Sequence, residues 1–241
     1  MPAEHKPLVY KMMTDLVGLH KGEVGVLVGN GISAEFYDLE KMRAAGCVLV
    51  GCNGSFTRDP IDYLVWQDNS QTPECVKFPG IKVTGYKRKK NEKFLTVLDS
   101  THFFTFGDPD KLPNNLSYGN SGYLALQFLV KLGCDPILMV GCDCRVFKIG
   151  AHWRANRFNN RVQERVKRVR TNILKKMGKR YSTGSLMSFA RKFNGLYEKY
   201  KERVTIRQLG PHHMTNIPDV DYPEFWTQWH PEMRKDRCRI I

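Results

Sequence analysis

The chemistry of this sequence is concentrated in the residues that follow its apolar runs. The first run ends at Gly29-Asn30-Gly31 and continues as Ile32-Ser33-Ala34, which matches G-x-G-x-x-(G/A) between an expected strand and an expected helix. Bare amides at a helix start suit phosphate oxygens, and Ser33 can cap that helix. The same pattern is also typical of a tight turn before a capped helix. We predict a nucleotide-binding turn that uses Asn30, Gly31 and Ser33.

The end of the second apolar run argues against one class of nucleotide enzyme. A dinucleotide-dependent oxidoreductase places an acid there, where it holds the ribose. This run ends in Cys52-Asn53-Gly54, so an amide stands where the acid would be. The sequence therefore disfavours a classical NAD enzyme.

Polar residues also end three later apolar runs. They are Gln67-Asp68, Asp143 and Gly210-Pro211-His212-His213. Short polar loops follow strands in general, but ligands of open α/β sheets lie outside the carboxyl ends of the strands. We therefore expect these residues to contribute to one site.

The elements that position these residues alternate along the chain. Expected strands cover 24–29, 47–52, 62–67, 103–106, 136–142 and 204–209, and expected helices cover 5–20, 33–45, 119–133, about 153–178 and 185–202. Continuous apolar strands are typical of a parallel sheet that is covered on both faces. The pattern predicts an α/β fold with a doubly wound, mainly parallel, Rossmann-like sheet and an extra long basic helix. We expect a single domain over 1–241, with loose loops at 69–93 and 107–117.

Composition limits the cellular setting. The chain is 41% hydrophobic and 26% charged, which is ordinary for a globular protein. It has no run of the ~18 apolar residues that a transmembrane helix needs and no signal-peptide core, so we predict a cytoplasmic protein. Its seven cysteines lie mostly in apolar runs, which favours reduced core thiols.

The net charge of +14 is distributed unevenly. The segment 151–180 holds eleven Lys or Arg and a single acid, Glu164, and a second basic run covers 86–93. On a helix over about 152–180, one stripe consists of Arg154, Arg157, Arg161, Arg165 and Arg168. An unpaired arginine stripe indicates a polyanionic partner, for which nucleic acid, an acidic glycan, an anionic membrane and a nucleotide's phosphates are all candidates.

Three blocks of the sequence resemble a known family. "VLVGNGISAEFYDLEKM" followed by "VLVGCNGSF" resembles the opening of the bacterial lipooligosaccharide sialyltransferases and of the related hydroxymethylpterin diphosphokinase-like Rossmann proteins. "NSGYLALQFLVKLGCDPILMVGCDC" resembles their second block, and "LYEKYKERVTIRQLGPHHMTNIPDV" resembles their final helix, strand and loop. The blocks cover about 100 residues in the family's order.

The resemblance implies a CMP-sugar whose nucleotide lies across these strand ends. Carried over by position, Asn30 and Gly31 face the phosphate or ribose, and Asn53 faces the cytidine. Gln67 or Asp68 lies near the ribose and the reacting sugar. Ser121 and Gly122 face the phosphate, and Asp143 lines the floor of the site. The diphosphokinase branch implies instead that Asp68 and Asp143 hold Mg²⁺ between phosphates.

One departure concerns the catalytic base. The sialyltransferases have a catalytic histidine in a loop before the last helix, and "GKRYSTGSLMSF" in this region contains none. The candidates are His152, His212 and His213, of which we favour His152, with Asp68 as a second candidate base. The His212-His213 pair is more typical of a loop or capping element than of a zinc site.

Three hypotheses follow from these observations. The first is a nucleotide-sugar-dependent glycosyltransferase with a CMP- or UDP-type donor and an acidic acceptor, with nucleic acid among the acceptors considered. The second is a Mg²⁺-dependent diphosphokinase-like phosphotransferase. The third is a nucleic-acid or nucleotide-binding protein without catalysis, since fold does not determine function. We favour the first.

Overall fold

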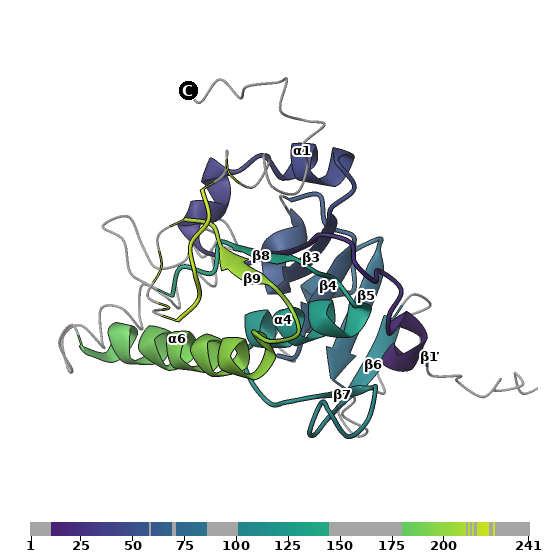
Figure 1. Cartoon of the computed structure of the whole chain (residues 1–241). Coiled ribbons are helices and arrows are strands. Elements are labelled where there is room, and N and C mark those ends of the chain that lie inside the picture. Colours follow the sequence, from purple (N-terminus) through teal and green to yellow (C-terminus); the bar gives the residue numbers. More distant parts are fainter. Residues whose placement is uncertain are drawn as a thin grey trace, which may run out of the picture.

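The strands form one parallel sheet (Figure 1). The computed structural model describes residues 11–57, 59–68, 71–85, 101–144, 180–210, 212, 214, 216–221 and 224. The strands are β1 Lys11–Met12, β2 Gly25–Val28, β3 Val48–Cys52, β4 Tyr63–Trp66, β5 Ile81–Gly85, β6 Thr101–Phe106, β7 Asn115–Leu116, β8 Ile137–Val140 and β9 Ile206–Gln208. Their order is β1-β6-β5-β4-β3-β2-β8-β9, and β7 pairs with β6. The predicted α/β class with a mainly parallel sheet is therefore confirmed.

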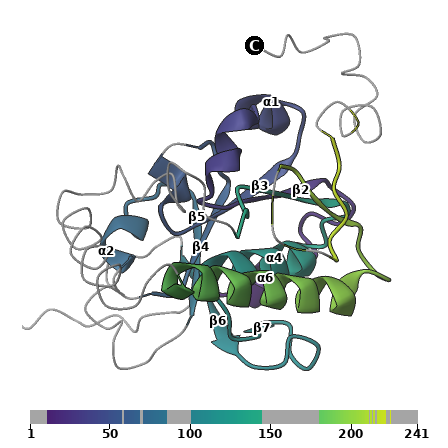
Figure 2. The same ribbon diagram turned by 90° about the vertical axis from the view of Figure 1, so that its left-hand side faces the viewer.

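The helices that cover the two faces of the sheet follow from the alternation of side chains along each strand. The α-helices are α1 Leu39–Ala44, α2 Thr72–Cys75, α4 Ser121–Leu132 and α6 Arg180–Tyr200, and the 3-10 helices are η1 Met13–Leu16, η2 Ile32–Phe36 and η3 Asn53–Thr57. Leu27 of β2 packs with α4 and α6, whereas its neighbours Val26 and Val28 pack with α1 and α2. Both ribbon views show α1 on one side of the sheet and α4 beside α6 on the other (Figures 1 and 2).

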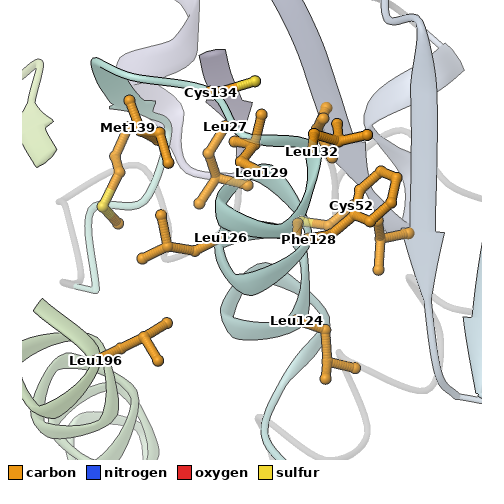
Figure 3. Packing of buried hydrophobic residues seen from close by; sticks show 14 of the residues in the cluster. Leu27, Cys52, Leu124, Leu126, Phe128, Leu129, Leu132, Cys134, Met139 and Leu196 are labelled. Atoms are coloured by element: carbon orange, nitrogen blue, oxygen red, sulfur yellow. The ribbon is translucent and has the colours of Figure 1, made fainter. Parts of the chain in front are cut away.

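The core beneath α4 fixes the position of that helix. Leu126 of α4 points toward Met139 of β8 and Leu196 of α6, and all three are buried (Figure 3). Asn120 caps the amino end of α4 by accepting the Tyr123 amide at 2.8 Å, and Gly133 ends it with a left-handed φ of 86°. The predicted helices 119–133 and 185–202 are confirmed as α4 and α6.

The helix expected over 5–20 is wrong for the described residues 11–20. They form β1, η1 and a turn whose amides bond to the carboxyl end of α4. Gly18 N–H donates to Lys131 O at 2.8 Å and His20 N–H to Leu132 O at 2.9 Å. These tertiary bonds satisfy the last carbonyls of α4, and they outweigh the weak helical pattern.

The loops expected at 69–93 and 107–117 contain regular structure. The first contains α2 and the buried strand β5, and the second contains β7. β5 does not read as apolar because it carries Lys82 and Thr84. The Lys82 ammonium donates to the carbonyls of Phe78 at 2.7 Å and Gly80 at 3.1 Å, and Thr84 donates to Trp66 O at 2.9 Å. These bonds offset the cost of burying polar groups, although burial still lowers the pKa of Lys82.

The helix expected over 33–45 is interrupted. Its residues form η2 and α1, because Tyr37 between them is extended at φ −122°, ψ 135°. Asp38 then caps α1 by accepting the Lys41 amide at 2.9 Å. The helix expected at 153–178 lies outside the described residues, and the single domain stays a prediction. Within the described part of the chain, no helix combines the length and apolar character needed to cross a membrane.

Candidate functional site

The order of the strands creates one switch point in the sheet. From β2 the chain continues to β3, β4 and β5 on one side, and it returns through α4 to β8 on the other side of β2. In open α/β sheets the crevice at such a switch point is where ligands bind. The residues after β2 and β8 therefore lie where proteins of this fold class bind their ligands.

The glycines after β2 are explained by the contact between these two strand ends. Gly31 N–H donates to Gly141 O at 2.7 Å. A Cβ at Gly31 would lie 2.5 Å from Gly141 O and 2.5 Å from Asp143 Oδ2, and a Cβ at Gly29 would also collide with Gly141 O. The turn thus needs glycine for protein packing, whether or not a phosphate approaches it.

Asp143 and Ser33 form a buried clasp at the base of this switch point. Asp143 is 2% exposed and Ser33 is fully buried. The Ser33 amide donates to Asp143 Oδ2 at 3.1 Å, and the Ser33 hydroxyl donates to Asp143 Oδ1. Ser33 was expected to cap the following helix, but Gly31 occupies the cap position of η2. Ser33 instead joins the turn after β2 to the segment after β8, where Asp143 accepts both of its hydrogen bonds.

Two amide side chains near the switch point are held with their NH₂ groups turned toward the backbone. Asn30 Nδ2 donates to Cys52 O at 3.1 Å, and Gln67 Nε2 donates to Gly119 O. The carbonyl oxygens of both side chains are buried and accept no hydrogen bond among the described residues. Each of these two side chains therefore has a buried carbonyl oxygen to which no described residue donates a hydrogen bond.

Asn53 adds a third such oxygen. Its φ of 51° is left-handed, which is uncommon for a residue other than glycine. Its Oδ1 is also buried without a partner in the described structure. A strained backbone next to an unsatisfied amide is typical of a functional site.

The unsatisfied buried polar atoms gather in one region. Nine buried side-chain atoms of the described residues lack a hydrogen-bond partner, and six of them follow β2, β3 or β4 or lie at the start of α4. The six are Asn30 Oδ1, Asn53 Oδ1, Ser55 Oγ, Gln67 Oε1, Asn120 Nδ2 and Ser121 Oγ. Since buried polar groups in proteins are nearly always hydrogen-bonded to protein, water or a ligand, this concentration makes the region the candidate binding site.

Contacts through Cys52 and Gly122 connect these groups. Asn30 Nδ2 lies 3.7 Å from Cys52 Sγ. A Cβ at Gly122 would lie 4.0 Å from the same sulfur and 3.3 Å from Asn120 Oδ1. The ends of β2 and β3 and the start of α4 therefore meet, and Gln67 joins them through Gly119.

The start of α4 can hold an anion. The first amides of an α-helix, here those of Ser121 and Gly122, have no acceptor within the helix. The Ser121 hydroxyl and Asn120 Nδ2 lie beside them and lack partners in the described structure. Helix amides, the helix dipole and two side-chain donors are groups that could together hold a phosphate. The sequence predicted Ser121 and Gly122 but not Asn120. An Asn directly before an apolar helix is a typical cap, and this position could have identified it.

The candidate bases differ in what the structure says of them. Asp68 is exposed directly after Gln67, and its backbone carbonyl accepts the Gln71 amide at 2.9 Å. His212 joins parts of its own loop, because its Nε2 bonds Asp219 Oδ1 at 2.6 Å and its Nδ1 accepts the Met214 amide at 2.9 Å. His152 and His213 lie outside the described residues. The same holds for the arginine stripe of Arg154, Arg157, Arg161, Arg165 and Arg168.

The arrangement does not support the magnesium hypothesis. Asp68 follows β4 and Asp143 follows β8, with β3 and β2 between them. At ~4.8 Å per strand the two strand ends are roughly 14 Å apart, too far for both carboxylates to contact one ion. Asp143 is also bonded to Ser33. Within the described ranges, no group of three or more His, Cys, Asp or Glu is arranged to hold a metal ion.

Comparisons with known proteins show the fold. No protein-family model matches the chain, and no curated protein matches it. The MAf glycosyltransferase from Magnetospirillum magneticum AMB-1 superposes with a TM-score of 0.54 at 8% identity, over 89% of this chain and 39% of the other. A variant of the sialyltransferase CST-II, solved in complex with CMP, superposes with a TM-score of 0.50 at 13% identity, over 82% of this chain and 86% of the other.

This chain thus spans about two fifths of the length of the MAf glycosyltransferase and most of the length of CST-II. At these identities the likeness establishes a fold shared with glycosyltransferases. It agrees with the predicted sialyltransferase-like Rossmann fold.

Proposed function

We propose that this protein is a nucleotide-sugar-dependent glycosyltransferase whose donor nucleotide binds across the carboxyl ends of β2, β3 and β4. The observation that carries the proposal is the cluster of unsatisfied buried polar atoms at the ends of β2, β3 and β4 and at the start of α4, on one side of the switch point. The fold shared with two glycosyltransferases supports it, as does the CMP bound in one of those structures.

The pattern of donors and acceptors favours a CMP-type donor over a UDP-type donor. Asn30, Asn53 and Gln67 each offer a buried carbonyl oxygen, so they need hydrogen-bond donors from the ligand. Ribose hydroxyls supply donors in every nucleotide. Cytosine adds an exocyclic amine with two N–H donors at the position where uracil has a carbonyl oxygen, whereas uracil offers the single N3–H donor, so cytosine supplies more donors to these acceptors.

The start of α4 suits the phosphate. Asn120 Nδ2, the Ser121 hydroxyl and the amides of Ser121 and Gly122 all donate, and the helix dipole adds a positive end. When the sugar leaves, negative charge grows on the phosphate oxygens. Donors that are already in place stabilise that charge without reorganisation.

The reaction that fits this geometry is a direct displacement at the sugar carbon. An acceptor hydroxyl oxygen bonds to that carbon, the bond from carbon to phosphate oxygen breaks, and CMP leaves with the electron pair. A base takes the hydroxyl proton. Asp68, exposed beside Gln67, and His152 are the proposed bases, and the arginine stripe is the proposed contact for an acidic acceptor.

Nucleotide binding by cap variants tests the proposal. Asn120→Ser keeps a good helix cap but removes the Nδ2 donor, and Asn120→Asp keeps the cap but places a negative charge beside the phosphate. By calorimetry we expect CMP affinity to fall about tenfold in the first variant, the equivalent of ~1.4 kcal/mol, and further in the second. The apo melting temperatures should stay close to that of the wild type.

The matched control is Thr101→Val, which removes another unsatisfied buried hydroxyl, at the opposite end of the sheet. It should leave CMP affinity unchanged. Equal affinity in all four proteins, or preference for UMP over CMP, contradicts the proposed site. CMP binding without slow hydrolysis of a CMP-sugar would favour the non-catalytic hypothesis, and a requirement for Mg²⁺ and ATP would favour the phosphotransferase.

A further inference from the structure

An exposed aromatic surface lies next to the proposed phosphate site. Tyr118 is 71% exposed and immediately precedes Gly119, whose carbonyl accepts Gln67 Nε2. Its ring lies 5.3 Å from that of Phe106, and Phe106 lies 5.2 Å from the buried ring of Phe104. The Tyr118 ring is thus backed by protein but open to solvent.

The ammonium of a lysine from another element lies over this ring. Lys192 of α6 has its Nζ 5.9 Å from the centroid of Tyr118. The position of α6 is fixed by the next residue, Phe193, which is buried and lies 6.4 Å from the ring of Tyr123. Lys192 forms no ion pair with an acidic residue of the described structure. It therefore presents a charge that an anionic ligand can neutralise.

The position of Tyr118 along the sheet edge can be compared with that of the proposed nucleotide site. Asn30 and Asn53 follow β2 and β3, whereas Phe106 ends β6 on the other side of β4. The start of α4, the proposed phosphate site, lies between these two groups. If the nucleoside lies over β2 and β3, the sugar and its acceptor extend toward Phe106 and Tyr118.

We infer that Tyr118, backed by Phe106 and flanked by Lys192, is the subsite that binds the acceptor, and that the acceptor is a sugar ring with a carboxylate. The inference rests on the proposed function and deepens it. The C–H face of a pyranose stacks on an open aromatic ring, the Tyr118 hydroxyl bonds a sugar hydroxyl, and the Lys192 ammonium pairs with the carboxylate. A single exposed aromatic ring is ordinary, but one joined to a polar site and a lysine is not.

The test uses two glycosides that differ in one group. Methyl β-glucuronide carries a carboxylate where methyl β-glucoside carries a hydroxymethyl group. With CMP present, saturation-transfer NMR should show the ring protons of the glucuronide close to the protein, with a stronger signal than the glucoside. Tyr118→Ala should abolish both signals, and Tyr118→Phe should retain them. Lys192→Ala should reduce the glucuronide signal to that of the glucoside.

The controls remove similar side chains elsewhere. Leu19→Ala removes an exposed apolar side chain near the other end of α4, and Lys201→Ala removes an exposed lysine after α6. Neither should change the spectra. Wild-type protein that gives no ring-proton signal, or signals that persist in Tyr118→Ala, would overturn the inference. Equal signals for both glycosides would overturn the part of the inference that assigns a carboxylate to the acceptor.

CMP affinity, measured in the same variants, separates this inference from the proposed function. Tyr118→Ala and Lys192→Ala should bind CMP as the wild type does. A loss of CMP affinity in Tyr118→Ala, with the glycoside signals intact, would assign the ring to the nucleoside and overturn the acceptor subsite. If CMP does not bind to the wild type, the proposed function fails, and the glycoside spectra without nucleotide still decide whether Tyr118 binds a sugar.

Discussion

Asp143 and Ser33 are 110 residues apart in the chain, yet the Asp143 carboxylate accepts both the amide and the hydroxyl of Ser33 in the buried base of the site. This pair joins the turn after β2 to the end of β8, the two strands that define the switch point.

Asp143→Asn should therefore destabilise the protein. An amide has one acceptor oxygen in place of two and would direct its NH₂ group at a Ser33 donor, so we expect a loss of about 2–3 kcal/mol in unfolding free energy. Urea denaturation measures it, with the exposed Asp68→Asn as control. A double-mutant cycle with Ser33→Ala should show a coupling of at least about 1 kcal/mol. Additive effects would mean that the two side chains act independently.

Two glycine substitutions should have opposite effects on stability. At Gly31 an alanine Cβ would lie 2.5 Å from Gly141 O and from Asp143, so Gly31→Ala should cost about 3 kcal/mol or more. Gly195 lies within α6, where an alanine Cβ would extend into open space, so Gly195→Ala should stabilise the helix by about 0.5–1 kcal/mol. Melting temperatures of the two variants provide the comparison. A well-tolerated Gly31→Ala would show that the strand ends are not in close contact.

Substitutions at Asn53 separate stability from binding. Because its φ is 51°, Asn53→Gly keeps the backbone unstrained and removes the amide. This variant should be about as stable as the wild type while its CMP affinity falls roughly tenfold or more, the effect of one lost hydrogen bond in a buried site. Asn53→Ala should lose affinity and also about 1 kcal/mol of stability. Calorimetry and denaturation of both variants test this, and undiminished CMP binding by Asn53→Gly would remove Asn53 from the site.

Alkaline pH should destabilise the protein through its buried thiols and a buried phenol. Burial raises the pKa of Cys47, Cys134 and Tyr63 to about 12, from 9.0 for the thiols and 10.0 for the phenol. These groups stay neutral in the folded state while the unfolded chain ionises. Their contribution is therefore complete below pH 9 and is lost as the pH rises toward 12.

Denaturation curves across that interval should show a stability that falls with pH. Cys47→Ala removes one thiol proton that the unfolded chain releases in this interval. The slope of its unfolding free energy against pH should therefore be shallower than that of the wild type by up to about 1.4 kcal/mol per pH unit. A slope identical to that of the wild type would show that Cys47 ionises in the folded protein as it does in the unfolded one.

The amino-acid sequence by itself determined the strands that are apolar throughout and the polar residues that end them. The runs around Val26, Val50, Val65 and Leu138 could be recognised because strands buried on both faces have no polar side. The carboxyl-end rule then predicted that Asn30, Asn53 and Gln67 belong to one edge, and the sheet order brings the ends of their strands to that edge.

Only the tertiary structure decided the roles that depend on partners distant in the chain. β5 was missed because Lys82 and Thr84 look exposed until the carbonyls of Phe78 and Trp66 accept their hydrogen bonds. Ser33 looked like a helix cap until Asp143 was placed beside it, and Asn120 looked like an ordinary polar residue until its Nδ2 was buried at the start of α4. The sequence shows which side chains are polar. Which polar atoms have hydrogen-bond partners depends on contacts between segments that only folding brings together.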